Sequence, residues 1–500
     1  MEERIVSITS GPIRGVRADG VSRFLGVPYA ASPTGPRRFA LPGPHAPWTQ
    51  VRDATQPGPN APQVVRDLGP LDPVPLVGDG WVKGDDFLSV NVWTPDEKAT
   101  GLPVMVFVHG GAFCVGSKDA PVNDGTGLAR AGVVSIAINY RLGIEGFLPI
   151  PGAPANLGLH DQLEAFRWVK ANARAFGGDP DNITIHGESA GAMTIANLVA
   201  SPLAEGLFRR AIIQSGHCAM VRKPSVALRM VKKVARMLGV KPDVKGFRST
   251  TLEQAVAALE QTQQPTFKID LRDPDTGLEP TFGLSKYAPV IGDSILPEAP
   301  IALLRKGVGK GVDLLIGTNA EEMNIYFVPL EVPKKVNGVL AWILLGKSIR
   351  KPWEILKAYG MGRRAGGKVK NGGQALTDAM TDLVFRAPAR AMAQAHQGRT
   401  HMYELDYRST AFGGEMGACH GLELPFVFNT IATCTGERGI AGPDTPQALA
   451  DRVVKLWVDF ARDGSFPSDE FTAESRQVYQ LSAGRAVAEP PMPAVAFLPK

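Results

Sequence analysis

His186-Gly187-Glu188-Ser189-Ala190-Gly191 is the stretch that decides the fold of this chain. An apolar run, residues 183–185, precedes it, and small residues that can form a helix, 192–198, follow it. Two glycines around Ser189 allow the close chain approach that a sharp turn between a strand and a helix requires. The N-terminus of that helix directs positive partial charge at the serine. The pattern therefore predicts a serine nucleophile on a strand–turn–helix elbow.

The rest of the chain alternates segments typical of strands and of helices. Residues 156–176 carry apolar positions near helical spacing and are predicted to form the helix that leads into the elbow strand. We predict further strands at residues 5–8, 21–25, 88–93, 103–108, 133–138, 210–214 and 313–317. Strands that alternate with helices indicate an α/β fold with a mostly parallel central sheet flanked by helices.

Two segments interrupt this alternation, at about residues 221–287 and 327–399. Both are interpreted as mostly helical insertions that form the walls or the lid of a pocket. Large α/β folds often run longer than an average domain, so we expect residues 1–500 to form a single domain that carries these insertions.

The second insertion contains an unusually basic segment. Residues 334–370 hold ten Lys or Arg and one acid, Glu354. The favoured interpretation is a solvated helical face. Two alternatives stay open: a basic rim that attracts acidic substrates, or a membrane-surface contact through Trp342 and Trp353.

Composition excludes several other classes of protein. The net charge of +5 over 500 residues is too small for a dedicated nucleic-acid binder, and no apolar run is long enough to cross a bilayer. No secretory signal is visible at the start, which favours a cytoplasmic protein over a secreted chain whose signal has been removed. We expect a monomer or weak homo-oligomer. We interpret the four cysteines, which have no metal-binding spacing, as reduced, buried thiols: Cys114, Cys218, Cys419 and Cys434.

A serine hydroxyl is a poor nucleophile at neutral pH, so Ser189 needs a base, and the base needs an orienting acid. On an elbow of this kind the acid and then the histidine follow the serine in chain order. The downstream histidines are His217, His396, His401 and His420. His420 lies in a small-residue turn, 417–426, that can present an imidazole at a sheet edge. Glu321 and Glu322 both follow a predicted strand, and chemistry alone leaves the choice between them open.

A third element is a cradle for negative charge. His109-Gly110-Gly111-Ala112-Phe113 follows an apolar run and resembles the His-Gly-Gly motif of lipases and esterases. Its backbone N–H groups can converge on an oxyanion together with the N–H of Ala190. A phosphate-binding loop is the competing interpretation, but the Lys-Ser/Thr of a P-loop and the pattern Gly-x-Gly-x-x-Gly are both absent from the sequence.

With these motifs in view, the chain resembles the type-B carboxylesterases, the family of the cholinesterases and para-nitrobenzyl esterases, in a bacterial-type form. The resemblance covers nearly the whole length. It rests on the elbow and on residues 24–30, 85–92, 139–143, 156–162, 176–180 and 287–290.

The resemblance implies an α/β-hydrolase fold and a serine hydrolase that cleaves small-molecule carboxylic esters through an acyl-enzyme, without metal or organic cofactor. It places the nucleophile at Ser189, the base at His420 and, of the two glutamates, the acid at Glu322. The implied supporting residues are the oxyanion-hole amides of Gly111, Ala112 and Ala190, a buried carboxylate at Glu188 that tunes the site, and a hydroxyl near the triad at Ser215.

Departures from the family pattern bear on these expectations. Met323 replaces the glycine that usually follows the acid, so we expect a differently shaped loop there. Phe87 replaces a cysteine that secreted animal members pair in a disulfide, which fits an intracellular member. Within enzymes, an amidase or carbamate hydrolase is the alternative, because the same groups can attack those carbonyls. A non-catalytic adhesion protein of this fold is disfavoured because all three triad positions are filled.

Overall fold

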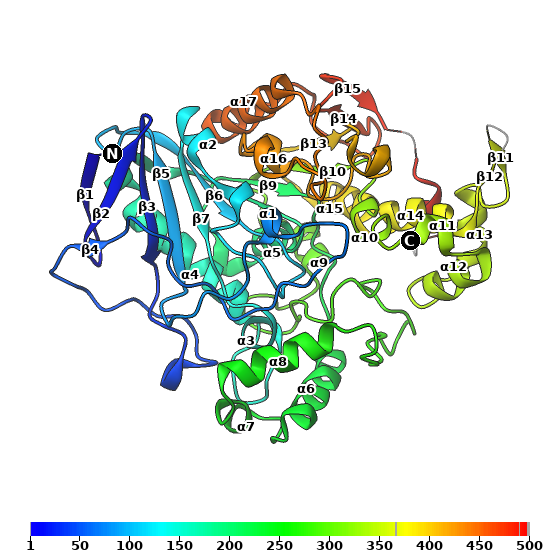
Figure 1. The fold of residues 1–500 in the computed structure, drawn as a ribbon, viewed down its shortest axis with the longest axis horizontal. Coiled ribbons are helices and arrows are strands. Elements are labelled where there is room, and N and C mark those ends of the chain that lie inside the picture. The colour runs from blue at the N-terminus through cyan, green and yellow to red at the C-terminus, as the bar shows by residue number, and fades with distance from the viewer. Residues whose placement is uncertain (1, 366–367, 490, 498–500) are drawn as a thin grey trace.

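The computed structural model describes residues 2–365, 368–489 and 491–497, and its centre is one large twisted sheet (Figure 1). From one edge to the other, neighbouring strands follow the order β1, β2, β3, β5, β7, β6, β8, β9, β10, β13, β14 and β15, and β4 pairs with β2. Their bounds are β1 Glu2–Ile8, β2 Gly11–Ala18, β3 Val21–Pro28, β4 Arg52–Asp53, β5 Ser89–Thr94, β6 Leu102–Val108, β7 Val134–Ile138, β8 Gly178–Glu188, β9 Arg210–Gln214, β10 Asp313–Asn319, β13 Thr400–Leu405, β14 Gln477–Gln480 and β15 Arg485–Ala488.

The middle of the sheet is parallel and its ends are antiparallel. Each neighbouring pair from β7 through β14 is parallel, whereas the pairs β1–β2, β2–β3, β3–β5, β5–β7 and β14–β15 are antiparallel, and the short β4 runs parallel to β2. The mostly parallel sheet predicted from the sequence is therefore confirmed. The order in space differs from the order in the chain, since β5 pairs with β7 and β6 lies between β7 and β8.

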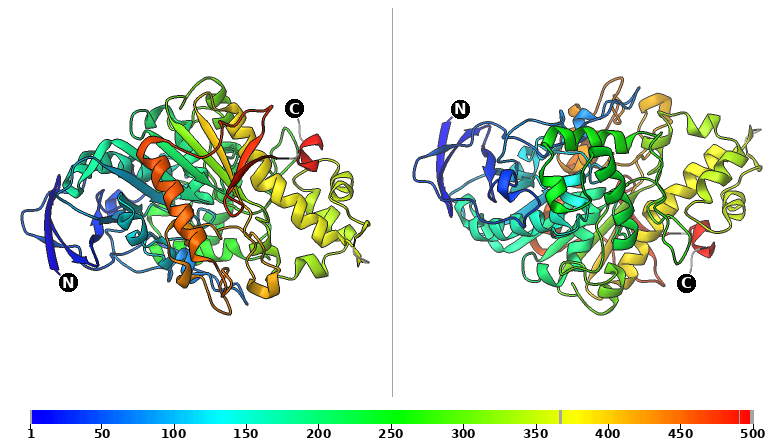
Figure 2. Two further views of the ribbon diagram at one scale, coloured as in Figure 1. Left: turned by 90° about the horizontal axis from the view of Figure 1, so that it is seen from above. Right: turned by 90° about the horizontal axis from the view of Figure 1, so that it is seen from below.

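Helices cover both faces of the sheet, which is why side chains on both sides of the central strands β6 and β7 are buried. Along β6, Val104, Val106 and Val108 pack into one hydrophobic cluster, while Met105 and Phe107 pack into another on the opposite face. The first cluster includes α4 (Leu157–Asn172) and α5 (Ala190–Val199). The second includes α2 (Thr126–Arg130) and α17 (Gln447–Asp463), and α17 crosses the sheet in the view from above (Figure 2).

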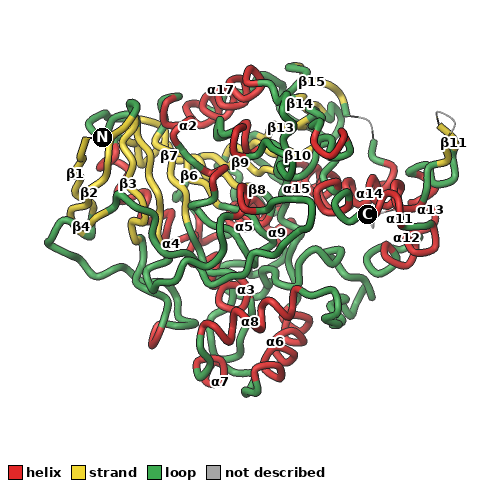
Figure 3. Tube along the Cα trace, viewed as in Figure 1, coloured by secondary structure: helices red, strands yellow, loops and turns green. Residues whose placement is uncertain are grey.

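The first insertion is helical only in its first half. It forms α6 (Pro224–Leu238), α7 (Val244–Arg248) and α8 (Leu252–Gln263), below the sheet in Figure 1. Residues 264–299 are irregular up to α9 (Pro300–Arg305) and appear as loop in Figure 3. Five prolines in this stretch remove backbone N–H donors and clash with helical geometry, which explains the difference from the helix expected there.

The second insertion is mostly helical and projects at the end of the molecule opposite β1 (Figures 1 and 2). Its elements are α10 Asn324–Phe327, α11 Val332–Lys335, α12 Gly338–Leu345, α13 Pro352–Ala358, the hairpin β11 Arg364–Ala365 and β12 Lys368–Val369, α14 Gly372–Thr381 and α15 Ala387–Ala395. The remaining α-helices are short: α1 Val74–Val77, α3 Gly143–Phe147 and α16 Leu424–Val427. The single-domain organisation stays a prediction.

Candidate active site

Ser189 lies on the elbow between β8 and α5, as the motif predicts. Its backbone has φ 55° and ψ −125°, a conformation that non-glycine residues rarely adopt and that costs strain. The turn requires glycine on either side of Ser189 because the neighbouring backbone approaches these two positions closely. A Cβ on Gly187 would lie 2.7 Å from the carbonyl oxygen of Val108, and one on Gly191 only 2.1 Å from it. The elbow can form because these two positions carry no side chain.

Glu322 and His420 are brought into direct contact from two different loops. His420 Nδ1 lies 2.7 Å from Glu322 Oε2, and both side chains are buried. The other carboxylate oxygen, Glu322 Oε1, accepts a 2.7 Å hydrogen bond from the amide of Asn319 at the end of β10. These bonds hold the carboxylate in place and favour the tautomer in which Nδ1 carries the proton. Glu321 lies outside this contact and pairs with Arg408 instead.

The second nitrogen of the imidazole faces Glu188. His420 Nε2 lies 2.9 Å from Glu188 Oε1, an ion-pair distance, although neither atom makes a hydrogen bond among the described residues. Burial lowers the pKa of His420, but Tyr326 and the carboxylates of Glu188 and Glu322 outweigh it and raise that pKa well above its ordinary value. Ser189 and His420 line the same pocket, and within the described residues no hydrogen bond joins their side chains.

The glycine-rich loop after β6 lies against the elbow. A Cβ on Gly110 would lie 2.6 Å from Glu188 Oε2 and 3.0 Å from the Cβ of Ser189, so the backbone touches the nucleophile's turn. Gly111 and Ala112 have φ of 105° and 53°. Among the residues that the structure describes, their amides donate to no backbone carbonyl. Ala190 begins α5, so its amide has no partner within the helix.

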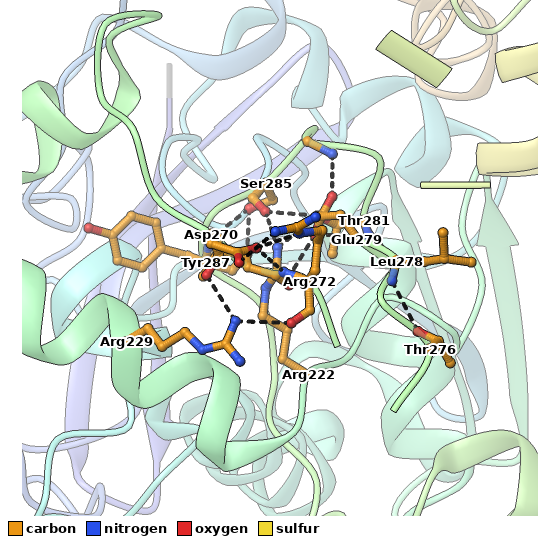
Figure 4. A network of polar contacts seen from close by, with 12 residues as sticks. Arg222, Arg229, Asp270, Arg272, Thr276, Leu278, Glu279, Thr281, Ser285 and Tyr287 are labelled. Atoms are coloured by element: carbon orange, nitrogen blue, oxygen red, sulfur yellow. Dashed lines mark hydrogen bonds and ion pairs between the residues drawn. The ribbon is translucent and has the colours of Figure 1, made fainter. Parts of the chain in front are cut away.

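A polar network from the first insertion supports this loop from behind (Figure 4). The buried Arg222 guanidinium lies at its centre and donates 2.8 Å hydrogen bonds to the hydroxyl of Thr281 and the carbonyl oxygen of Ser285. Arg222 also pairs with Glu279 at 2.8 Å. The Ser285 hydroxyl donates to the carbonyl oxygen of Ala112 at 2.9 Å. The irregular half of the insertion is therefore tied to the candidate oxyanion loop.

Two positions singled out in the sequence, Ser215 and Met323, form no side-chain hydrogen bond with Ser189, Glu322 or His420 in the described part of the chain. Ser215 is fully buried after β9, and its hydroxyl has no hydrogen-bond partner in the described part of the chain. Met323 is also fully buried, and its amide donates to Thr381 Oγ1 at 3.1 Å. The backbone φ of Met323 is −73°, a value that any residue can adopt, so the backbone at this position does not require the family's glycine.

Tyr326 is a site residue that the sequence analysis missed. Its ring centroid lies 5.5 Å from that of His420, and it lines the pocket with Ser189. Burial raises the pKa of Tyr326 to about 12, against the opposing effects of His420 and Ser189. The available signal was its position four residues after Glu322, the spacing of one helical turn.

Glu423 is a second missed residue. It is fully buried, and Asn319 Nδ2 donates to its Oε2 at 2.6 Å. Burial, with repulsion from Glu188 and Glu322, raises the pKa of Glu423 well above its ordinary value. Its position three residues after His420 was the only signal in the sequence.

The pocket in front of Ser189 is a cavity of about 230 Å³ with mostly apolar walls. Leu68, Leu71, Ile325 and Leu424 are among its lining residues. Arg66 also lines it, and the Nε of Arg66 is buried without a hydrogen-bond partner among the described residues. An apolar cavity with polar groups gathered at one end suits a small molecule with one reactive polar bond.

Comparison with known proteins agrees with this arrangement. The model of the carboxylesterase family matches residues 2–489. The chain belongs to the carboxylesterase family. This carboxylesterase has the α/β-hydrolase fold and is a hydrolase of carboxylic esters. It is 34% identical to para-nitrobenzyl esterase of Bacillus subtilis, over 94% of this chain and 92% of that protein. It is 32% identical to phenmedipham hydrolase of Pseudarthrobacter oxydans, over 93% and 91% of the two chains.

Solved structures of esterases resemble it closely. A structure of PNB esterase aligns with a TM-score of 0.82 at 31% identity, over 99% of this chain and all of that one. A Geobacillus stearothermophilus carboxylesterase aligns with a TM-score of 0.81 at 31% identity, over 97% and 98% of the chains. Within the described residues, no helix is long and apolar enough to span a bilayer, and no cluster of three His, Cys, Asp or Glu side chains could bind a metal ion.

Proposed function

We propose that this carboxylesterase cleaves esters through an acyl-enzyme on Ser189. Ser189 Oγ attacks the ester carbonyl while His420 Nε2 takes its proton, and the protonated imidazole then gives that proton to the leaving alcohol. Water attacks the acyl-enzyme in the second half-reaction, with His420 again as base. The observation that carries the proposal is the 2.7 Å contact between His420 Nδ1 and Glu322 in the same pocket as Ser189.

The resting contact between His420 and Glu188 adds one step. Nε2 must leave Glu188 Oε1 and face Ser189 Oγ before it can accept a proton, while Nδ1 stays bonded to Glu322. Only the neutral imidazole can act as base. The raised pKa of His420 therefore predicts that, as the pH is lowered, activity is lost at a higher pH than it would be with a histidine of ordinary pKa.

The amides of Gly111, Ala112 and Ala190 are proposed to stabilise the tetrahedral intermediate. They lie beside the elbow, and none is committed to a backbone carbonyl among the described residues. The loss of one such donor typically costs about 3 kcal/mol of transition-state stabilisation.

The walls of the pocket support a substrate class. The apolar lining favours esters with a small apolar group, and the unpartnered Nε of Arg66 offers one donor to a polar substituent. The cysteines are free, buried thiols, which supports a cytoplasmic location. A monomer or weak homo-oligomer stays the prediction for the assembly.

A pair of serine variants tests the mechanism. Ser189→Ala should lose p-nitrophenyl ester turnover and fluorophosphonate labelling, with its thermal unfolding midpoint retained. Ser249→Ala is the matched control, because Ser249 is exposed on the first insertion, and it should keep both properties. Turnover or labelling of Ser189→Ala at the wild-type level would refute the proposal.

A second comparison distinguishes an esterase from an amidase or carbamate hydrolase. A phenyl ester, an anilide and a carbamate with matched aromatic groups are supplied to the same enzyme preparation. The proposal expects the ester to be hydrolysed with the highest kcat/KM. A higher value for the anilide or the carbamate would assign the protein to the alternative class.

A further inference from the structure

Helix α12 is eight residues long, and most of its large apolar side chains are exposed to solvent. Ala341 and Leu345 are buried and anchor the helix to the protein. The other large apolar side chains are exposed: Val339 at 61%, Leu340 at 42%, Trp342 and Ile343 at 47% and Leu344 at 41%. An apolar stretch of this kind would ordinarily lie in a core or be covered by a partner.

Neighbouring residues extend this surface. Leu330 and Trp353 are exposed at 68% and 40%, so that eight of the fifteen large hydrophobic side chains exposed among the described residues lie between 330 and 369. We call Leu330, Val339, Leu340, Trp342, Ile343, Leu344 and Trp353 the α12 patch. It lies on the part of the molecule that projects farthest from β1 (Figures 1 and 2).

The α12 patch is surrounded by unneutralised positive charge. Residues 334–370 contain ten Lys or Arg and one acid. Lys334, Lys335 and Lys370 pair with acids in the described structure. Six further basic residues are exposed and, among the described residues, form no ion pair: Lys347, Arg350, Lys351, Lys357, Arg363 and Arg364.

The combination of charge and apolar surface selects the partner. A two-fold contact between copies would bring two such basic segments together, and like charges across an interface are repulsive. Apolar side chains with tryptophans, flanked by Lys and Arg, match the interface of a bilayer that contains anionic lipids. We propose that the α12 patch docks the protein on the surface of an anionic phospholipid bilayer.

The location of the patch relates docking to the candidate active site. The C-terminal end of α12, at Leu344 and Leu345, lines a cavity of about 830 Å³ together with Ser285 and Lys286. Ser285 belongs to the network of Figure 4 and donates to Ala112 of the candidate oxyanion loop. Docking would therefore place this cavity, and the wall behind the oxyanion loop, beside the membrane surface.

Vesicle binding tests the proposal without depending on catalysis. The full chain is sedimented with vesicles of phosphatidylcholine alone and with vesicles that contain about three parts in ten of phosphatidylglycerol. We expect binding to the anionic vesicles only, weakened as salt rises because salt screens the attraction. Trp342→Ser combined with Ile343→Ser, and separately Lys347→Glu with Arg350→Glu and Lys351→Glu, should each lower the affinity by about tenfold or more.

Matched control variants lie on the opposite part of the molecule. Leu41→Ser with Lys98→Glu changes an exposed apolar side chain and an exposed cation, and vesicle binding should be retained. All variants should keep wild-type turnover of a soluble p-nitrophenyl ester. Equal binding to neutral and anionic vesicles, or none to either, would overturn the proposal. A wild-type dimer in light scattering that the Trp342 and Ile343 substitutions dissociate would assign the patch to a second copy instead.

Discussion

The candidate active site and the α12 patch depart from the usual distribution of side chains in opposite directions. The site buries three carboxylates, Glu188, Glu322 and Glu423, around one imidazole. The patch exposes tryptophans and aliphatic side chains to solvent. Burial of charge and exposure of large apolar side chains both cost free energy, so each is informative about function.

The difference between the two regions lies in what compensates the cost. In the site, Asn319 donates hydrogen bonds to Glu322 and Glu423, and His420 contacts Glu322 and Glu188, so each buried carboxyl group has a polar neighbour within the fold. On the α12 patch, the apolar side chains stay at least 40% exposed, and six of the cations around them form no ion pair within the described chain. Buried charge therefore indicates chemistry that the protein performs by itself, and exposed apolar surface indicates a partner.

The largest effect on kcat is expected when the negative charge of Glu322, which orients the His420 imidazole, is removed. Glu322→Gln keeps the shape of the side chain but no longer favours the Nδ1–H tautomer, so kcat should fall by about a thousandfold or more. Steady-state kinetics on a p-nitrophenyl ester measure it. Glu321→Gln is the matched control, since Glu321 pairs with the exposed Arg408, and it should stay near wild type. A large loss in the control alone would reassign the acid.

A smaller effect is expected from crowding of the oxyanion loop. In Gly110→Ala the added Cβ would lie 2.6 Å from Glu188 Oε2, so the loop must shift and the amides of Gly111 and Ala112 leave their positions. We expect kcat to fall by about a hundredfold. Gly311→Ala is the matched control, because Gly311, like Gly110, has no positive φ, and a Cβ added there would meet open space. An equal effect in the control would contradict the oxyanion assignment.

The pH profile is expected to respond to Glu188. The negative charge beside Nε2 stabilises the imidazolium, so Glu188→Gln should lower the pKa of His420. Because the neutral base is the active form, the acid limb of kcat/KM should move to lower pH. The titratable groups that face His420 besides Glu188 are Glu322, Tyr326 and Glu423. An acid limb that stays in place would show that Glu188 does not tune the imidazole.

The smallest effect, a change in the free energy of unfolding, is expected from an alanine substitution on the exposed side of α12. Leu345→Ala removes a buried side chain and should lower the free energy of unfolding by about 2–4 kcal/mol. Ile343→Ala, two residues away but 47% exposed, should change it by less than about 0.5 kcal/mol. Calorimetric unfolding of the two variants measures the contrast. A similar loss in both would mean that the patch is packed against the protein and not free for a membrane.

Much of the fold could be predicted because its signals are local. Residues 103–108 and 133–138 are almost entirely apolar, with Ser135 the one polar residue, and they form β6 and β7, both buried on two faces. The spatial order of these strands carries no such signal, since β5 pairs with β7 across the sheet. The irregular chain at 264–299 differs from the helical interpretation because its prolines outweigh its apolar spacing.

The candidate active site likewise has features that local sequence reveals and features that only the spatial arrangement reveals. Ser189 could be located because the elbow needs a glycine two positions before the serine and another two positions after it. Tyr326 and Glu423 were missed, although each lies one helical turn from a residue that was named, because spacing alone does not show what a side chain faces. The contact between His420 Nε2 and Glu188 joins residues more than two hundred positions apart, and sequence spacing cannot reveal such a contact.

The sequence by itself determined the elements and the chemical groups: the elbow, the apolar strands, the acid and histidine candidates and the basic segment. These depend on the backbone preferences and periodicity of neighbouring residues, which the chain carries locally. Only the tertiary structure decided which carboxylate flanks which nitrogen, which acid has a raised pKa and which side of α12 faces solvent. Each of these depends on the dielectric surroundings and packing that distant segments create when they meet.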